Sequence, residues 1–291
     1  MKKHNGTILL ATLTALTIFF TILSMLSFDP RKVFTYLIMG LAFSLVSIVV
    51  YFRKLEFLAS SATHTSLLAV IIGLMIESLT RIHYFLWSMI IGLAIIHIAG
   101  FMIRKGIEPN NTSAIIVAST SAFSVIAAYI LVTRFPIGYN LNSLFLGDPL
   151  LITYTDMSFV AGVTIIISVI FALSLFEILS LGIDEVTLKI LGLKTTLYDL
   201  MTYTIIGLAT IGLLRVSGYI LQHVLILLPA ITSSFYSRSG KELILLSITL
   251  SLFASSVGFF ISLLVNLSPT GVTGVVLVTC LIHGVLKRWE K

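Results

Sequence analysis

The stretch SSATHTSLLAVIIGLMI, residues 60–76, places one histidine among hydroxyl side chains at the start of a run apolar enough to lie in a membrane. Similar apolar runs recur along the whole chain. Its 291 residues are 58% hydrophobic and 10% charged, with a mean hydropathy of +1.11. A soluble domain carries about 25% charged residues. The composition therefore predicts an all-α, polytopic membrane protein.

Charge clusters and turn residues divide the chain into apolar segments of the length that spans a bilayer, roughly 17 to 25 residues. We expect about eight to ten spanning helices in one membrane domain over residues 1–291. The range reflects a continuous run between residues 200 and 235 and a short last segment, either of which could be re-entrant. The expected segments are residues 7–28, 33–52, 57–79, 83–103, 112–133, 157–178, 200–217, 218–235, 243–265 and 272–286.

The first segment has the basic start and apolar core of a signal peptide, but its apolar run from Thr7 to Phe28 is long enough to span a bilayer. We interpret it as a retained first helix. Most of the 18 Lys and Arg residues fall on one side of the membrane when the segments alternate. Because basic residues accumulate in cytoplasmic loops, both termini are predicted to face the cytoplasm. Basic residues in twos and threes between apolar runs also argue against a nucleic-acid partner.

A connection on the predicted cytoplasmic side, LSLGIDEVTLKILGLKTTLYD at residues 179–199, has the signals of a short helix. Asp184 and Glu185 are acidic residues of the kind that stabilises a helix amino terminus. Lys189 follows Glu185 at i+4, and Gly192 can end the helix in a left-handed conformation. Two interpretations fit this helix: it rests on lipid headgroups, or it docks a partner protein.

Histidines lie inside several predicted spans, where an ionisable side chain is costly and usually faces protein or an aqueous path, and two of them are candidates for function. His64 has two serines one turn before it on the same helical face, and the residues alone fit either helix packing or an ion or proton role. His223 lies in GYILQHVLILLPAI, between Gly218 and Pro229. This pattern predicts either a kinked helix that lines a pore or a structural kink alone.

Other polar residues carry weaker signals. Asp148 lies in a Gly-Asp-Pro turn of an outer loop, where its charge suits the reception of a cation. Glu77 and Arg81 are spaced i,i+4 at the outer end of a segment, and we expect them to form a surface ion pair. His83 and His97 are expected to be structural.

Motifs of several enzyme classes are missing from the sequence. The pair Gly240-Lys241 in SRSGKE has neither the upstream glycine nor the following Ser or Thr of a phosphate-binding loop. The sequence also contains no HExxH and no GxSxG, and its single cysteine, Cys280, has no disulfide partner. We therefore expect a membrane protein that is not itself an enzyme.

Five stretches in order resemble the membrane permease subunits of ATP-binding-cassette importers for manganese, zinc or iron. YFRKLEFLASSATHTSLLAVIIGL is similar to the family segment in which a basic pair precedes a helix with a Ser-His-Ala-type motif, with His64 at the histidine. FLGDPLLIT is similar to the outer Gly-Asp stretch and GIDEVTLKILG to the cytoplasmic coupling region. LLRVSGYILQHVLILLPAI is similar to an Arg-x-x-Gly to Pro-Ala segment, and SPTGV at residues 268–272 to a Pro-Thr-Gly turn. The resemblance covers residues from about 51 to 286.

This resemblance implies a division of labour in the plasma membrane. A separate ATPase would dock at Asp184, Glu185 and Gly192. An extracytoplasmic binding protein would deliver a divalent metal ion to the outer loops, and two permease subunits, expected to be copies of one chain, would enclose the path past His64 and His223. The metal is the transported substrate, moved by alternating access, and no permanently bound cofactor is implied.

The sequence departs from this family at Ser60. The family often has an aspartate four residues before the motif histidine, so that a carboxylate and an imidazole bind one cation together. Manganese favours carboxylate oxygen, whereas imidazole suits zinc. The serine therefore favours zinc slightly, although His223 or carboxylates elsewhere could complete a site for either metal.

Three alternatives stay open at this point. A cobalamin or siderophore importer shares the general architecture but moves a large chelate, and a path lined by histidines favours bare ions. A proton-driven secondary transporter could use His64 and Glu77 as a relay and predicts inverted repeats, which are not evident. A purely structural scaffold leaves the coupling-region resemblance unexplained.

Overall fold

The computed structural model describes residues 4–135 and 141–289, which form thirteen helices and no strand. This confirms the predicted all-α class. The helices are α1 (His4–Ser27), α2 (Pro30–Arg53), α3 (Glu56–Thr80), α4 (Tyr84–Arg104), α5 (Pro109–Arg134), α6 (Leu141–Leu146), α7 (Tyr154–Ile183), α8 (Glu185–Ile190), α9 (Thr195–Gly212), α10 (Leu214–Ser217), α11 (Tyr219–Tyr236), α12 (Gly240–Val265) and α13 (Pro269–Trp289).

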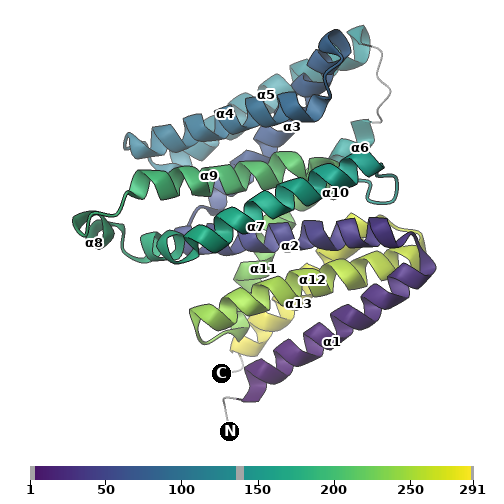
Figure 1. Cartoon of the computed structure of the whole chain (residues 1–291), viewed down its shortest axis with the longest axis vertical. Helices are drawn as coiled ribbons and strands as arrows, with labels where there is room; N and C mark the ends of the chain where they lie inside the picture. The colour runs from purple at the N-terminus through teal and green to yellow at the C-terminus, as the bar shows by residue number, and fades with distance from the viewer. Residues whose placement is uncertain (1–3, 136–140, 290–291) are drawn as a thin grey trace.

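Within the described ranges, nine helices are long and apolar enough to cross a membrane, namely α1 to α5, α7 and α11 to α13. The 18-residue α9 is more polar, but it packs against α3, α4 and α7 and runs alongside the other helices (Figure 1). Most of its residues are buried inside the protein, so it needs less apolar surface than a helix that faces lipid. These helices confirm the predicted count of about eight to ten.

The helices are stacked in three groups (Figure 1). α3, α4 and α5 lie at one end, α2, α7 and α9 in the middle, and α1, α11, α12 and α13 at the other end. α2 joins the groups, because it packs against α7 on one side and against α11 and α12 on the other. Its side chains Tyr36, Met39 and Phe43 have no exposed surface. α1, by contrast, lies at the edge of the stack, where only 6% of its most apolar stretch is buried.

The first turn of α1, the last turn of α13 and the short helix α8 lie at the same edge of the stack (Figure 1). An even number of crossings, with α9 among them, accounts for this arrangement. The two ends of the chain and the predicted coupling region therefore share one side. That this side faces the cytoplasm stays a prediction from the basic residues.

Some helix bounds differ from the predicted segments. α7 has 30 residues, because Thr153 and Asp156 form a capping box before its first turn and the helix continues to Ile183. The apolar run between residues 200 and 235 divides at Gly218, where the two predicted segments meet, but the first helix of the run ends before residue 217. α9 ends at Gly212, and Gly218, with φ of 74°, separates α10 from α11.

The predicted ion pair between Glu77 and Arg81 is wrong. Arg81 has a left-handed backbone, with φ of 61°, and its N–H donates to the carbonyl of Glu77 at 2.8 Å. Arg81 therefore ends α3 instead of continuing it, and the helical i,i+4 geometry does not apply. The ion pairs of the described residues are Arg53–Asp199, Glu185–Lys189 and Asp156–Arg215.

Candidate functional site

The two histidines predicted for the ion path lie side by side. His64 on α3 and His223 on α11 have ring centroids 5.6 Å apart. Tyr219, one turn before His223, packs against both imidazoles, at 5.3 Å from the His64 ring and 5.4 Å from the His223 ring. We call His64, Tyr219 and His223 the histidine cluster. Sequence reasoning missed Tyr219, although its i−4 spacing from His223 places both side chains on one helix face.

Hydroxyl groups surround the two imidazoles. The hydroxyls of Tyr219 and of Ser121 on α5 each lie 3.0 Å from Nδ1 of His64. For His223, Nδ1 lies 3.3 Å from the carbonyl of Tyr219, and Nε2 lies 2.7 Å from the hydroxyl of Thr63. The hydroxyl of Thr63 has one proton, and it donates to the carbonyl of Ser60 at 2.7 Å, so these contacts fit either tautomer of His223. The tautomer with the proton on Nδ1, which donates to the carbonyl of Tyr219, is the one that metal-binding histidines commonly have.

The histidine cluster lies on a partly exposed face of the chain. Its three rings and Ser121 all retain exposed surface. Gln222, next to His223, is instead fully buried: its amide donates to the carbonyl of Thr210 at 2.7 Å and accepts from Ser66 at 3.3 Å. These bonds tie α11 to α9 and α3. Since consecutive helical residues point in different directions, they hold His223 toward the open face.

The cluster alone does not form a complete metal site. Among residues 4–135 and 141–289, no group of three or more His, Cys, Asp or Glu side chains could hold a metal ion. Ser60, one turn before His64, is partly exposed and supplies a hydroxyl where a carboxylate would be a stronger cation ligand. A cation between the two imidazoles would therefore have open coordination positions. These would have to be filled by ligands other than the residues that the structure describes.

Gly218 lies at the junction of α10 and α11, where the predicted segments 200–217 and 218–235 meet. A side chain at this position would clash, since a Cβ on Gly218 would lie 2.2 Å from the backbone nitrogen of Gly147. The φ of 74° also favours glycine. The close approach fixes the start of α11, and with it Tyr219, against the turn that follows α6.

Pro229 lies inside α11 and removes a backbone donor from it. Ser47 of α2 lies against α11 beside this proline. Its hydroxyl accepts from the N–H of Ala230 at 3.0 Å and donates to the carbonyl of Leu227 at 3.4 Å. These two bonds join α2 to α11 beside Pro229.

Asp148 lies at the opposite edge from α8, in the turn between α6 and α7. Its carboxylate accepts from the N–H of Leu151 at 3.2 Å, and the side chain is partly exposed. Its role in receiving a cation stays a prediction. Close to this turn, Arg215 and Asp156 form an ion pair of 2.7 Å in which Asp156 is only 4% exposed, and sequence reasoning missed this pair.

The predicted short helix is α8, and its capping interactions are those expected. Asp184 precedes it and accepts from the backbone N–H and the hydroxyl of Thr187, at 3.0 and 2.6 Å. These hydrogen bonds, the side-chain bond first, lower the pKa of Asp184. Glu185 and Lys189 form an exposed ion pair, and Gly192 follows the helix with φ of 83°.

The outer surface of α8 is apolar. Val186 is 69% exposed, Ile190 80% and Leu191 74%. A contiguous apolar surface at a protein edge indicates a binding surface for a membrane or a partner. Beside α8 lies a cavity of about 510 Å³, whose polar wall contains the buried ion pair of Arg53 and Asp199. Sequence reasoning missed this pair as well.

Comparison with known proteins supports the family resemblance described from the sequence. A profile of the ABC 3 transport family matches residues 25–288. The manganese import system permease protein ScaB of Streptococcus gordonii is 22% identical over 241 residues, 83% of this chain and 84% of that protein. The solved structure of PsaBC from Streptococcus pneumoniae in complex with Fab has a TM-score of 0.77 at 21% identity, covering 91% of this chain and 94% of that one. An inward-facing structure described as a metal-chelate type ABC transporter has a TM-score of 0.71 at 13% identity, covering 97% and 99%. Because the profile spans most of its length, the chain belongs to the ABC 3 transport family.

Proposed function

We propose that this chain is the membrane subunit of an ATP-binding-cassette importer that moves a divalent metal ion, zinc or manganese, into the cytoplasm. The pairing of His64 and His223 from two distant helices carries the proposal. Imidazole is the commonest metal ligand in proteins. In the tautomer with its proton on Nδ1, which donates to the carbonyl of Tyr219, His223 would bind the cation through Nε2 once Thr63 moves aside.

Family membership and the apolar helices make the chain a multi-pass protein of the plasma membrane. Within that setting, the partly exposed face of the histidine cluster supports a second permease subunit. Two copies that faced each other through this surface would enclose a path and bring further ligands to the cation. The incomplete ligand set of the described residues is consistent with such a shared path.

The ATPase would dock on α8. The apolar side chains Val186, Ile190 and Leu191 offer the surface to be covered, and the capped ends of the helix keep that surface rigid. The location of α8 at the same edge as both termini supports contact with a cytoplasmic protein (Figure 1). An extracytoplasmic binding protein would deliver the ion at the opposite edge, near Asp148.

Alternating access would follow from movement of α11 relative to its neighbours. The helix begins at the Gly218 junction and its backbone hydrogen bonding is interrupted at Pro229. The segment between these points carries His223. When the ATPase pair closes on ATP, a shift of α8 and the helices joined to it would change which side of the membrane reaches the cluster.

Two observations bear on the transported substrate. The named relative is a manganese permease, whereas the hydroxyl of Ser60 in place of a carboxylate favours zinc. The solved structures include a chelate-type transporter, so the fold alone does not separate bare ions from chelates. The paired imidazoles favour the bare ion. A proton relay from His64 to Glu77 has no support, because 13 residues of helix separate them by about 20 Å.

Reconstitution with the partner ATPase and binding protein in liposomes tests the proposal. We expect uptake of zinc or manganese only when ATP is present on the side of the liposome membrane that carries the ATPase. His223→Ala should abolish most of this uptake, whereas His97→Ala, which removes a histidine that bonds Leu93 and Thr204 on α4 and α9, should retain it. Transport of no divalent metal, or equal loss in both variants, would contradict the proposal.

A further inference from the structure

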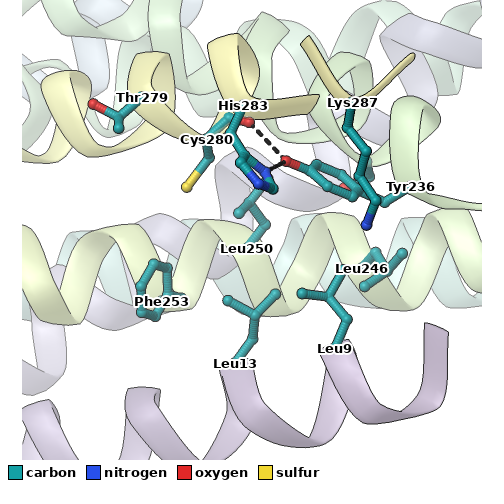
Figure 2. Close-up of a pocket in the computed structure, with 11 residues that line it drawn as sticks. Leu9, Leu13, Tyr236, Leu246, Leu250, Phe253, Thr279, Cys280, His283 and Lys287 are labelled. Atoms are coloured by element: carbon teal, nitrogen blue, oxygen red, sulfur yellow. Dashed lines mark hydrogen bonds between the residues drawn. The ribbon is translucent and has the colours of Figure 1, made fainter. Parts of the chain in front are cut away.

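A second feature of the fold is unrelated to the histidine cluster. A cavity of about 400 Å³ lies between α1, α11, α12 and α13 (Figure 2). Leu9 and Leu13 of α1 face Leu250 and Phe253 of α12 across it, and α13 closes the third side. The volume is in the range of ligand pockets, about 300 to 1,000 Å³. Its lining is almost entirely apolar.

The larger polar side chains of the cavity gather at one end. Figure 2 shows Tyr236, His283 and Lys287 together there, whereas Phe253 and Thr279 lie at the other end. The hydroxyl of Tyr236 already donates to the carbonyl of Cys280 at 3.0 Å and lies 2.6 Å from Nδ1 of His283. The ammonium group of Lys287 lies 5.5 Å from the centre of the Tyr236 ring and is exposed. Lys287 is therefore the cation that the cavity offers to a ligand.

This polar end lies where a membrane meets water. It is formed by the last turns of α13 and the first turns of α1, at the edge that both termini share (Figure 1). Trp289 is 81% exposed there, and Arg288, the residue before it, is exposed as well. Tryptophan at a helix end is typical of the membrane interface. From Thr279 to Lys287, eight residues of helix place the apolar end about 12 Å deeper, within the hydrocarbon region.

The cavity thus has an apolar part at the depth of the hydrocarbon chains and a cation, Lys287, at the depth of the headgroups. α1 forms its outer wall and is buried along only 6% of its most apolar stretch, so the described part of the chain leaves this apolar side uncovered. Apart from the hydroxyl groups of Ser233 and Thr279, the walls consist mainly of leucine and phenylalanine side chains, which give water few partners. A phosphate headgroup would pair with Lys287, and an acyl chain would fill the apolar part.

We propose that this cavity binds one anionic phospholipid from the membrane leaflet at the side of both termini, with its phosphate at Lys287 and an acyl chain between α1 and α12. The site goes beyond metal transport and does not depend on it. The bound lipid would hold α1, which otherwise packs mainly against α12, to α13.

Native mass spectrometry of the purified full chain in detergent tests this site. The probes are phosphatidylglycerol and phosphatidylcholine with identical acyl chains. We expect the first phosphatidylglycerol to bind about fivefold more tightly than the first phosphatidylcholine, which corresponds to about 1 kcal/mol for one lysine at an anionic surface. Lys287→Gln should make the two lipids bind about equally.

Lys105→Gln is the matched control. Lys105 also ends a helix, α4, and its ammonium group lies 5.4 Å from the centre of the Phe101 ring, but it does not line the cavity. Thr279→Trp fills the apolar end and should weaken binding of both lipids. Thr279 is exposed and its hydroxyl bonds only within α13, so this variant keeps the tertiary contacts.

Three results would overturn the proposal. The first is equal binding of the two lipids by the unaltered chain. The second is a loss of preference in Lys105→Gln as large as in Lys287→Gln. The third is a dimer signal that excludes lipid and disappears in Thr279→Trp, which would show that a second copy of the chain covers this face.

Discussion

Replacing Asp199 with asparagine tests the buried ion pair beside α8. Arg53 at the end of α2 and Asp199 in α9 are joined by a contact of 2.6 Å, and their side chains are only 8% and 9% exposed. Asparagine keeps the shape of the aspartate side chain but removes its charge. The guanidinium of Arg53 would then stay buried without its counter-ion.

The expected loss is about 3 to 5 kcal/mol of the free energy of unfolding, the range measured when one member of a buried pair is removed. The geometry favours a value inside this range, because Nη1 of Arg53 is buried with no hydrogen-bond partner, and Asp199 therefore supplies the main compensation for the charge. The exposed pair of Glu185 and Lys189, 41% and 57% exposed, is the natural comparison. Glu185→Gln should cost at most about 0.5 kcal/mol.

Denaturant unfolding in mixed micelles, followed by tryptophan fluorescence, measures both variants against the unaltered chain. A double variant, Arg53→Met with Asp199→Leu, should recover more than half of the loss, because it removes both buried charges. If Asp199→Asn unfolds within about 0.5 kcal/mol of the unaltered chain, the reasoning from burial and pairing fails. The same conclusion follows if the double variant is less stable than Asp199→Asn.

Three further predictions concern transport. His64→Ala should lower metal uptake about tenfold or more without reducing assembly of the complex, and unchanged uptake kinetics would remove His64 from the ion path. Asp184→Lys should abolish the stimulation of the ATPase by the permease while the ATPase alone keeps its rate; normal stimulation would argue against docking at α8. Ser60→Asp should raise manganese uptake relative to zinc, because it adds a hard oxygen ligand one turn from His64. An unchanged ratio in a transport assay with both metals would show that residue 60 does not face the cation.

Local features of the fold could be predicted from the sequence. The bilayer sets the length of a spanning helix, so apolar runs between charges indicated most of the helices. Both ends of α8 were also predictable, since Asp184 and Gly192 act on backbone groups within a few residues of themselves. The histidines of the site were recognisable because an ionisable side chain stands out in an apolar segment.

Contacts between distant segments were not predictable in the same way. Arg53 and Asp199 are 146 residues apart, and Asp156 and Arg215 are 59 residues apart. Nothing in the local pattern matches one member of a pair with the other. A usable signal was the position of these charges at the ends of apolar runs, where each needs a partner. The Glu77 and Arg81 prediction failed for the opposite reason, because a local spacing rule was applied across a helix end.

The serine that completes α11 at Pro229 also bears on how the protein is made. In hydrocarbon, an unsatisfied peptide group costs several kcal/mol, so α11 inserted alone would be an unfavourable intermediate. Ser47, which accepts from the N–H of Ala230 next to Pro229, precedes Ala230 by 183 residues. Since synthesis runs from the amino terminus, α2 has entered the membrane before α11 leaves the ribosome. When α11, the helix that carries His223, is inserted, α2 is therefore already in the membrane. The hydroxyl of Ser47 is then available to the backbone of α11 beside Pro229 from the start of assembly.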